Sequence, residues 1–445
     1  MSGMATQTPQ GSKGLGQYLP LALAAGVGSM LGSGIIVGLS STITVWQDGL
    51  GLDNGQVGVL SGVLTFAIAF GSLFGGRIAE RVGRVPFFNW INLLYAAGAL
   101  ACVFTNSFAV LLVGLIIAGF ASGADLPVSM TVVSHDAPND AMSARLVSAT
   151  QVFWQLGVFI SFICAFLVST MSGATGGRIV FAILAAFAVF TWLWRTLSPK
   201  LRELHKAADE RAAIRHDAYA GKKVSVFQVL FGKDKKILLT YFISILVFYV
   251  GWNLLANTWG QFQTFMFVKA DASQTLATGL GIVLNLVTLI INIVFASIAG
   301  GKYRNRAFFV GIGITFVAMV SLALGGTNLW IIVGAVAVMN LGSPLAGEAI
   351  YKVWTQESFP IEIRASMQGF INGFSRLVCG LFALVTPALV LPATIKTTMW
   401  GFAVIVIIEA VAGTIMIKSQ KRYGTDEERI EASMSDKAFT AQSAQ

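Results

Sequence analysis

The sequence predicts an all-α membrane protein with twelve transmembrane helices in two six-helix, pseudo-symmetric halves. Hydrophobic residues make up 55% of the chain and charged residues 11%, whereas roughly a quarter of the residues of a soluble domain are charged. Twelve apolar stretches recur along the chain, and a helix of about 20 apolar residues crosses roughly 30 Å of hydrocarbon. The longest polar interval follows the sixth stretch, so the helices divide six plus six.

The predicted spans follow one another with short connections: 19–46, 56–75, 87–105, 108–133, 146–170, 178–197, 237–267, 274–300, 307–326, 329–356, 365–390 and 397–417. The regions are then a tail at 1–18, a first half at 19–197, a linker at 198–236, a second half at 237–417 and a tail at 418–445. The linker is expected to contain an amphipathic helix, because its apolar residues recur on one side. They are Leu201, Leu204, Ala208, Ala212 and Ile214.

Basic residues set the expected orientation in the membrane. They gather in alternate loops and in the C-terminal tail: Arg77, Arg81, Arg84, Arg145, residues 200–236, Lys302, Arg304, Arg306, Arg364, Lys418, Lys421 and Arg422. Loops rich in Lys and Arg stay in the cytoplasm, so both termini are expected there, in a multi-pass protein of the cell membrane. The net charge of +9 then faces anionic lipid, and no nucleic-acid partner is needed to explain it.

The sequence argues against several classes of function. No G-x-x-x-x-G-K-[ST] motif is present, which argues against ATP hydrolysis on this chain. His135, His205 and His216 are scattered, without the spacing typical of metal ligands. We therefore expect no enzymatic activity, no cofactor and no metal site.

The segment from Gly75 to Arg84, Gly-Gly-Arg-Ile-Ala-Glu-Arg-Val-Gly-Arg, lies between the second and third predicted spans. It resembles the signature loop of the major facilitator superfamily, G-x-x-x-D-R-x-G-R, with Glu80 in place of the aspartate. The small Gly75 and Gly76 permit close approach of helices, and Glu80 can pair with Arg84 when a cytoplasmic gate is closed. Any cytoplasmic loop collects arginines, but that does not explain the glycines and the acid together. The resemblance implies a secondary transporter.

Two further segments resemble the sugar porter family. Residues Glu357 to Arg364 match its E-x-F-P-x-x-x-R, in which acid and arginine can form a cytoplasmic gating pair; an ordinary helix end before proline is the alternative. Arg145 followed by Gln151 and Gly157 resembles a fifth-helix motif whose glutamine contacts sugar. The sequence departs from the family at Gly32, where proton-coupled relatives carry aspartate.

Polar residues inside the spans mark the expected pathway, because each would be costly facing lipid. Amides offer both donors and acceptors to a neutral polyhydroxyl ligand, and a tryptophan can cover the C–H face of a sugar. Interhelical hydrogen bonding, worth around 0.6 kcal/mol per bond, is the alternative role of the amides. The candidate residues for substrate binding are Gln151, Trp154, Gln155, Asn253, Asn257, Gln261, Asn285 and Arg376.

Four charged residues lie deeper in the spans: Asp125, Glu348, Lys352 and Arg376. At a rise of about 1.5 Å per residue, Glu348 and Arg376 lie at similar depth, so they are expected to be able to meet. Three roles stay open. The cluster is a structural salt bridge, or it contains a proton-binding carboxylate, with Glu348 first and Asp125 second, or Lys352 and Arg376 bind an anionic substrate.

These observations favour a monomeric transporter that imports a monosaccharide or polyol by alternating access, coupled to protons. A substrate site at mid-membrane between the halves is expected for that organisation. The alternatives are a sugar uniporter, a symporter of sugar acids or organic anions, and an exporter of drugs or metabolites.

Overall fold

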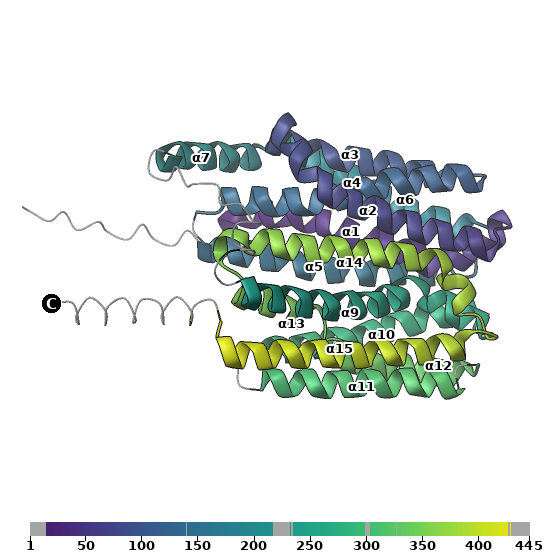
Figure 1. Ribbon diagram of the computed structural model, residues 1–445. Coiled ribbons are helices and arrows are strands. Elements are labelled where there is room, and N and C mark those ends of the chain that lie inside the picture. Colours follow the sequence, from purple (N-terminus) through teal and green to yellow (C-terminus); the bar gives the residue numbers. More distant parts are fainter. Residues whose placement is uncertain are drawn as a thin grey trace, which may run out of the picture.

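The chain forms a bundle of long helices that lie side by side (Figure 1). This computed structural model describes residues 15–138, 140–216, 232, 235–298, 303–325, 327–425 and 428, and these contain helices and loops without strands. Helices are expected here because hydrocarbon offers no hydrogen-bonding partner to the backbone. We call the end of the bundle beside α7 the α7 end, and the other the opposite end.

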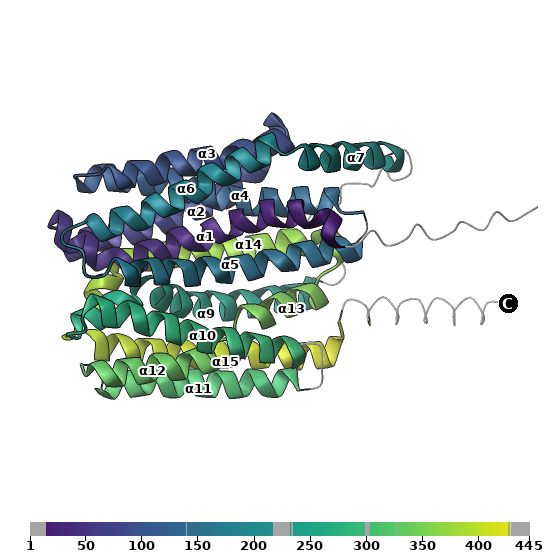
Figure 2. The ribbon, with the colours of Figure 1, turned by 180° about the vertical axis from the view of Figure 1, so that it is seen from behind.

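The first half contains α1 (Leu15–Leu50), α2 (Asn54–Val82), α3 (Arg84–Val103), α4 (Phe108–Asp136), α5 (Asp140–Leu167) and α6 (Thr175–Leu197), and α7 (Pro199–His216) follows it. The second half contains α9 (Lys235–Lys269), α10 (Gln274–Ile298), α11 (Arg304–Gly325), α12 (Leu329–Gly342), α13 (Glu348–Ser358), α14 (Ile361–Leu389) and α15 (Ile395–Tyr423). The two halves form the upper and lower parts of the bundle, with α14 and α5 at their boundary (Figures 1 and 2).

Twelve crossings agree with the predicted number. Within the described residues, ten helices are long and apolar enough to cross a membrane, and the shorter apolar stretches Val152–Leu167 in α5 and Leu329–Gly342 (α12) bring the number to twelve. The tenth crossing differs from its prediction as one helix over 329–356, because it is two helices, α12 and α13, separated by residues 343–347. Pro344 has no N–H to donate and Gly347 adopts φ −144°, ψ −140°, so the helix is interrupted there.

The hairpin between α2 and α3 turns at Gly83, whose φ of +102° favours glycine. Gly75 faces α4, where an added Cβ would lie 2.7 Å from the Cα of Ala124. Gly76 has no neighbour within 4 Å of such a Cβ. Of the two glycines predicted to allow close approach, Gly75 alone does so.

The linker helix α7 packs on the α7 end of the first half. Leu201, Leu204 and Ala208 are buried there, and His205 Nδ1 makes a hydrogen bond with Asp136 at the end of α4. The side chains of Ala212 and Ile214, predicted on the same side, lie outside the described residues.

The halves contact each other along α2 with α14, α5 with α10, and α1 with α9. The first two pairs are equivalent by pseudo-symmetry, because each joins the second helix of one half to the fifth of the other. The contacts with the shortest approach lie toward the opposite end, where a Cβ at Gly58 would overlap the carbonyl oxygen of Leu384. Side chains of the two halves also bond to each other there: Thr44 Oγ1 to Gln274 Oε1 at 2.6 Å and Ser169 Oγ with Thr275 Oγ1 at 2.7 Å.

We predict that Gly58→Ala separates the halves at the opposite end. Alanine favours a helix by roughly 1 kcal/mol over glycine, but here its methyl group meets backbone that has no alternative rotamer, and such overpacking costs about 1–3 kcal/mol. Spin labels at Ser172→Cys and Thr327→Cys, both exposed in loops of this end, should report longer distances, with Cys102, Cys164 and Cys379 replaced by serine.

Gly369→Ala on α14 is the matched control, because no atom lies within 4 Å of its added Cβ. Unchanged distances in Gly58→Ala, or equal changes in both variants, contradict the prediction.

Candidate functional site

An aromatic stack forms the base of the candidate site, halfway along α9. The rings of Tyr249 and Tyr351 lie 3.8 Å apart at 19°, and those of Tyr249 and Trp252 lie 5.6 Å apart at 22°. Both tyrosines are buried. The stack joins α9 to α13, and Trp252 at one end of it is half-buried.

Polar groups of α9 and α14 lie beside this stack, and all but Arg376 are neutral. Asn372 Nδ2 donates to the Tyr249 hydroxyl at 3.2 Å, and its Oδ1 accepts from Arg376 Nε at 3.0 Å. One turn farther along α9, Asn253 Nδ2 donates to Ser375 Oγ at 2.9 Å. These bonds align amides and hydroxyls from two helices in one cluster, which we call the α9–α14 cluster: Tyr249, Asn253, Asn372, Ser375 and Arg376.

The break in the tenth crossing borders this cluster. Trp252 Nε1 donates to Ser343 Oγ at 2.9 Å, and an added Cβ at Gly347 would lie 2.5 Å from that same indole nitrogen. Glycine therefore lets the break lie against the Trp252 ring. Glu348 is the first residue of α13, where the helix dipole favours an acid.

Glu348 pairs with Lys352 one turn along α13, at 2.9 Å. Their side chains are 46% and 37% exposed, so neither side chain is buried in this structure. The predicted meeting of Glu348 and Arg376 is also not found, because no ion pair joins these two described residues. Each side chain turns along its own helix, Glu348 to Lys352 and Arg376 to Asn372.

The first half contributes fewer described groups. Trp154 of α5 packs with Val37, Val158 and Phe162, and Ile282 of α10 joins that cluster. Gln155 is half-buried beside it. The side chains of Gln151 and Arg145 lie outside the described residues.

The remaining predicted amides have partners of their own. Gln261 Nε2 donates to Asn257 Oδ1 at 2.8 Å and to Thr65 Oγ1 of α2 at 2.7 Å. It therefore belongs to the contacts between the halves toward the opposite end. Asn285 Nδ2 donates to the Gly281 carbonyl of its own helix at 2.9 Å, and is not part of the α9–α14 cluster.

Asp125 lies in a buried ion pair that the sequence reading missed. Arg195 Nη1 of α6 donates to Asp125 Oδ1 at 2.6 Å and to the Phe88 carbonyl at 2.7 Å. Its Nη2 donates to the Ala24 carbonyl at 2.8 Å, so the pair connects α1, α3, α4 and α6. Asp125 and Arg195 are 2% and 1% exposed. Gly28 of α1 leaves room for the pair, because an added Cβ there would overlap Asp125 Oδ2 and Arg195 Nη2.

The predicted gating residues are resolved in part. Glu357 accepts two hydrogen bonds from Arg304 of α11, at 2.6 and 2.9 Å, and its pairing with Arg364 stays a prediction. Arg84 is exposed at the start of α3. The side chains of Glu80 and Arg364 lie outside the described residues.

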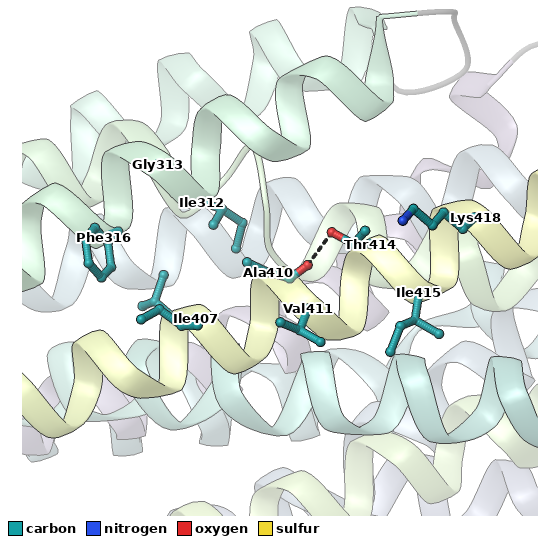
Figure 3. A pocket seen from close by; sticks show the side chains of 10 residues that line it. Ile312, Gly313, Phe316, Ile407, Ala410, Val411, Thr414, Ile415 and Lys418 are labelled. Carbon is teal, nitrogen blue, oxygen red and sulfur yellow. Dashed lines mark hydrogen bonds between the residues drawn. The ribbon is translucent and has the colours of Figure 1, made fainter.

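A separate groove of about 540 Å³ runs along the outside of the second half, between α11 and α15 (Figure 3). It is lined by Ile312, Phe316, Ile407, Val411 and Ile415, with Lys418 at one end. Since apolar side chains dominate it and none of the predicted site residues lines it, this groove is not the candidate site.

Sequence reasoning missed Tyr249, Tyr351, Asn372 and Ser375. A signal was present, because Gly-Ser-Pro-Leu-Ala-Gly at 342–347 interrupts a hydrophobic segment, and such interruptions point to binding sites in transporters with repeated halves. Residues that pack against a break can then be sought one turn on either side of it. Arg195 was missed because it lies near the end of its span, where an arginine is unremarkable.

Comparison with known proteins settles the family. The sequence profile described as Major Facilitator Superfamily matches residues 21–382. The chain belongs to the Major Facilitator Superfamily. This superfamily member is therefore a membrane transporter and not an enzyme.

Among similar proteins, the minor myo-inositol transporter IolF of Bacillus subtilis is 28% identical over 375 residues, 83% of each chain. A crystal structure of a D-xylose-proton symporter matches with a TM-score of 0.70 and 16% identity, over 89% of this chain and 97% of that one. The POT family transporter PepTSo matches with a TM-score of 0.68 and 14% identity, over 90% and 98%. At such identities the two solved structures show the fold, which transporters of different substrates share.

We predict that Asp125→Asn destabilises the folded protein by about 3–5 kcal/mol, because it leaves Arg195 buried without a counter-ion. Thermal unfolding in detergent should show the loss. The double variant Asp125→Leu with Arg195→Met should recover most of it, because apolar residues of similar volume replace a buried pair at little cost. An Asp125→Asn protein as stable as the wild type would contradict a structural role for the pair.

Proposed function

We propose that this transporter moves a monosaccharide or a polyol through a site at the α9–α14 cluster. The observation that carries the proposal is the combination of stacked aromatic rings with neutral amides and hydroxyls. Polyhydroxyl ligands need both donors and acceptors, and their C–H faces pack on aromatic rings. The myo-inositol transporter among the relatives and the D-xylose symporter among the solved structures support this substrate class.

The arrangement of the halves supports alternating access. In the present structure the opposite end is closed by Gly58 against Leu384 and by Thr44 with Gln274, so the substrate would exchange on the α7 side. We infer from the basic loops that the α7 side is cytoplasmic, with both termini there. Gln151, Trp154 and Gln155 would then approach the substrate from the first half. The gating groups at the α7 end would be Glu80, Arg84, Arg145, Glu357 and Arg364.

We further propose that the transporter imports its substrate together with protons. Glu348 is our first choice for the proton carrier, because its pairing with Lys352 lies next to the Trp252 and Tyr351 rings and can change when the site is occupied. Asp125 is second, and its pairing with Arg195 favours a structural role. A monomer suffices for this mechanism, because both halves of the site belong to one chain.

The hydrogen bonding of Arg376 favours one alternative, a symporter of sugar acids. Among the described residues, Arg376 donates only its Nε, to Asn372, which leaves its two Nη groups for a carboxylate. Lys352 adds a second cation one helix away. Competition of uptake by a sugar acid, compared with the neutral sugar, decides between the two substrate classes.

We predict that Asn253→Ala weakens binding of the transported polyol by about 1–3 kcal/mol, through a lost buried hydrogen bond, which is about 5- to 150-fold in Kd. The measurement is competition of radiolabelled myo-inositol uptake in proteoliposomes. Asn285→Ala is the matched control, because that amide bonds only to its own helix. Equal affinity in the Asn253→Ala variant and the wild type would exclude Asn253 from the site.

We also predict that an inwardly directed proton gradient drives myo-inositol above its equilibrium level. Glu348→Gln should abolish this accumulation and retain counterflow exchange, because the variant binds substrate but carries no proton. Glu203→Gln, which removes an exposed acid of α7 outside the proposed site and gate, should keep the accumulation. Wild-type protein that merely equilibrates myo-inositol and ignores the gradient is a uniporter.

A further inference from the structure

Glu409 of α15 is a buried acid outside the candidate site, and among the described residues it has no hydrogen-bond or ion-pair partner. Glu409 lies fourteen residues from each end of α15 (Ile395–Tyr423), about 21 Å from either, and is therefore at mid-membrane. It is 1% exposed. Its Oε1 is buried without a hydrogen-bond partner, and no ion pair or hydrogen bond joins it to another described residue.

The described side chains of the helices packed around α15 supply no counter-ion. Their described charged and titratable groups are Lys235, Lys236, Tyr241, Tyr249 and Lys269 on α9, Arg304 and Arg306 on α11, Glu348, Tyr351, Lys352 and Glu357 on α13, and Arg376 and Cys379 on α14. None of these groups makes an ion pair or hydrogen bond with Glu409. On α15 itself, the nearest charge in sequence is Lys418, nine residues away, or roughly 13 Å along the helix.

An ionised carboxylate in such surroundings is expensive. Removing a charge from water without a partner costs several kcal/mol even after the protein relaxes. Two hydrogen bonds or a cation would offset this, and neither is present around Glu409 in the described chain. The carboxyl group is therefore neutral in this conformation, which means that it holds a proton.

The location of Glu409 connects it to the candidate site. Its side chain lies on Gly251 of α9, where an added Cβ would be 2.8 Å from the Glu409 Cγ and 3.0 Å from its Oε1. The next two residues of α9 are Trp252 and Asn253, which bond to Ser343 and Ser375. A movement of α9 that rearranges the site therefore also changes the packing over the Glu409 carboxyl group.

A purely structural role explains this residue poorly. A leucine or methionine of similar volume would fill the space beside Gly251 without a polar atom to bury. The outward side of α15, with Ile407, Val411 and Ile415 along the groove of Figure 3, shows that this helix uses apolar residues where only packing is needed. An acid at the inward position has a consequence that an apolar residue lacks, because it can bind and release a proton.

We propose that Glu409 is a proton-binding residue of the conformational cycle: it is protonated when α9 covers it, as here, and releases its proton in a conformation that admits water between α9 and α15. This rests on the proposed function only in that the cycle is that of a transporter. The reaction is the dissociation of one carboxyl O–H bond, with the proton leaving to water and the electron pair staying on oxygen. The candidate site would then have two titratable acids near it: Glu348, paired with Lys352 on α13, and Glu409 on α15, on the other side of α9.

The test measures conformation against pH without any substrate. Spin labels at Ser172→Cys and Thr327→Cys in nanodiscs report the separation of the halves at the opposite end. In wild type, alkaline pH should move the distance distribution away from the closed state, because the deprotonated carboxylate requires hydration. Glu409→Gln mimics the protonated acid and should keep the acidic-pH distribution at every pH. Glu409→Asp retains a titratable acid and should keep the pH response.

Each outcome decides the proposal. A pH response that persists unchanged in Glu409→Gln overturns it, as does a wild-type distribution that does not respond to pH. If Glu409→Gln unfolds, infrared spectra of the wild type replace it: a protonated-carboxyl band that disappears at alkaline pH supports the proposal, and a constant or absent band overturns it. Uptake of myo-inositol by the wild type tests the proposed function separately, since the conformational measurement needs no substrate.

Discussion

A broken backbone inside a membrane must be covered by protein, and this constraint organises the second half of the molecule. The interruption at residues 343–347 exposes peptide groups that hydrocarbon cannot satisfy. Trp252 of α9 covers the break through its hydrogen bond to Ser343, and Gly347 makes room for the ring. The aromatic stack and the amides of α14 then follow from that contact, because α9 is fixed between the break and α14.

The first half uses a different solution for its buried polar groups. Arg195 brings a charge into the core, and Asp125 together with the carbonyls of Ala24 and Phe88 satisfies its donors. Its guanidinium also lies 3.7 Å from the centroid of the Phe88 ring. One closed network thus holds four helices of this half, whereas the second half leaves its polar groups in pairs beside a break. The half with the open arrangement is the one suited to bind a ligand and to move.

Hydrophobicity was sufficient to predict the number and order of the membrane crossings, because a crossing requires a long apolar segment. Hydrophobicity was not sufficient to predict which side chains contact each other. The ion pair of Glu357 with Arg304 of α11 was not predicted, because nothing in sequence spacing reports which helix lies next to which. Gly75 and Gly76 are adjacent in one motif, and yet only Gly75 faces another helix. The rotation of a helix about its axis determines which residues face a neighbouring helix, and this rotation is hard to predict when almost all residues of the helix are apolar.

The opposite end is closed by contacts between uncharged groups, and this determines how it responds to salt. Its contacts join glycines, hydroxyls, amides and apolar side chains, with Gly58 on Leu384, Thr44 on Gln274 and Ser169 on Thr275, and no charged side chain takes part in them. Attraction between such groups acts over very short distances and is hardly screened by ions. Ionic strength should therefore leave closure of this end unaffected, while the ion pair between Arg304 and Glu357 at the α7 end weakens in salt. Salt on the α7 side of the membrane would therefore change the stability of that end, whereas salt on the other side would leave closure of the opposite end unchanged.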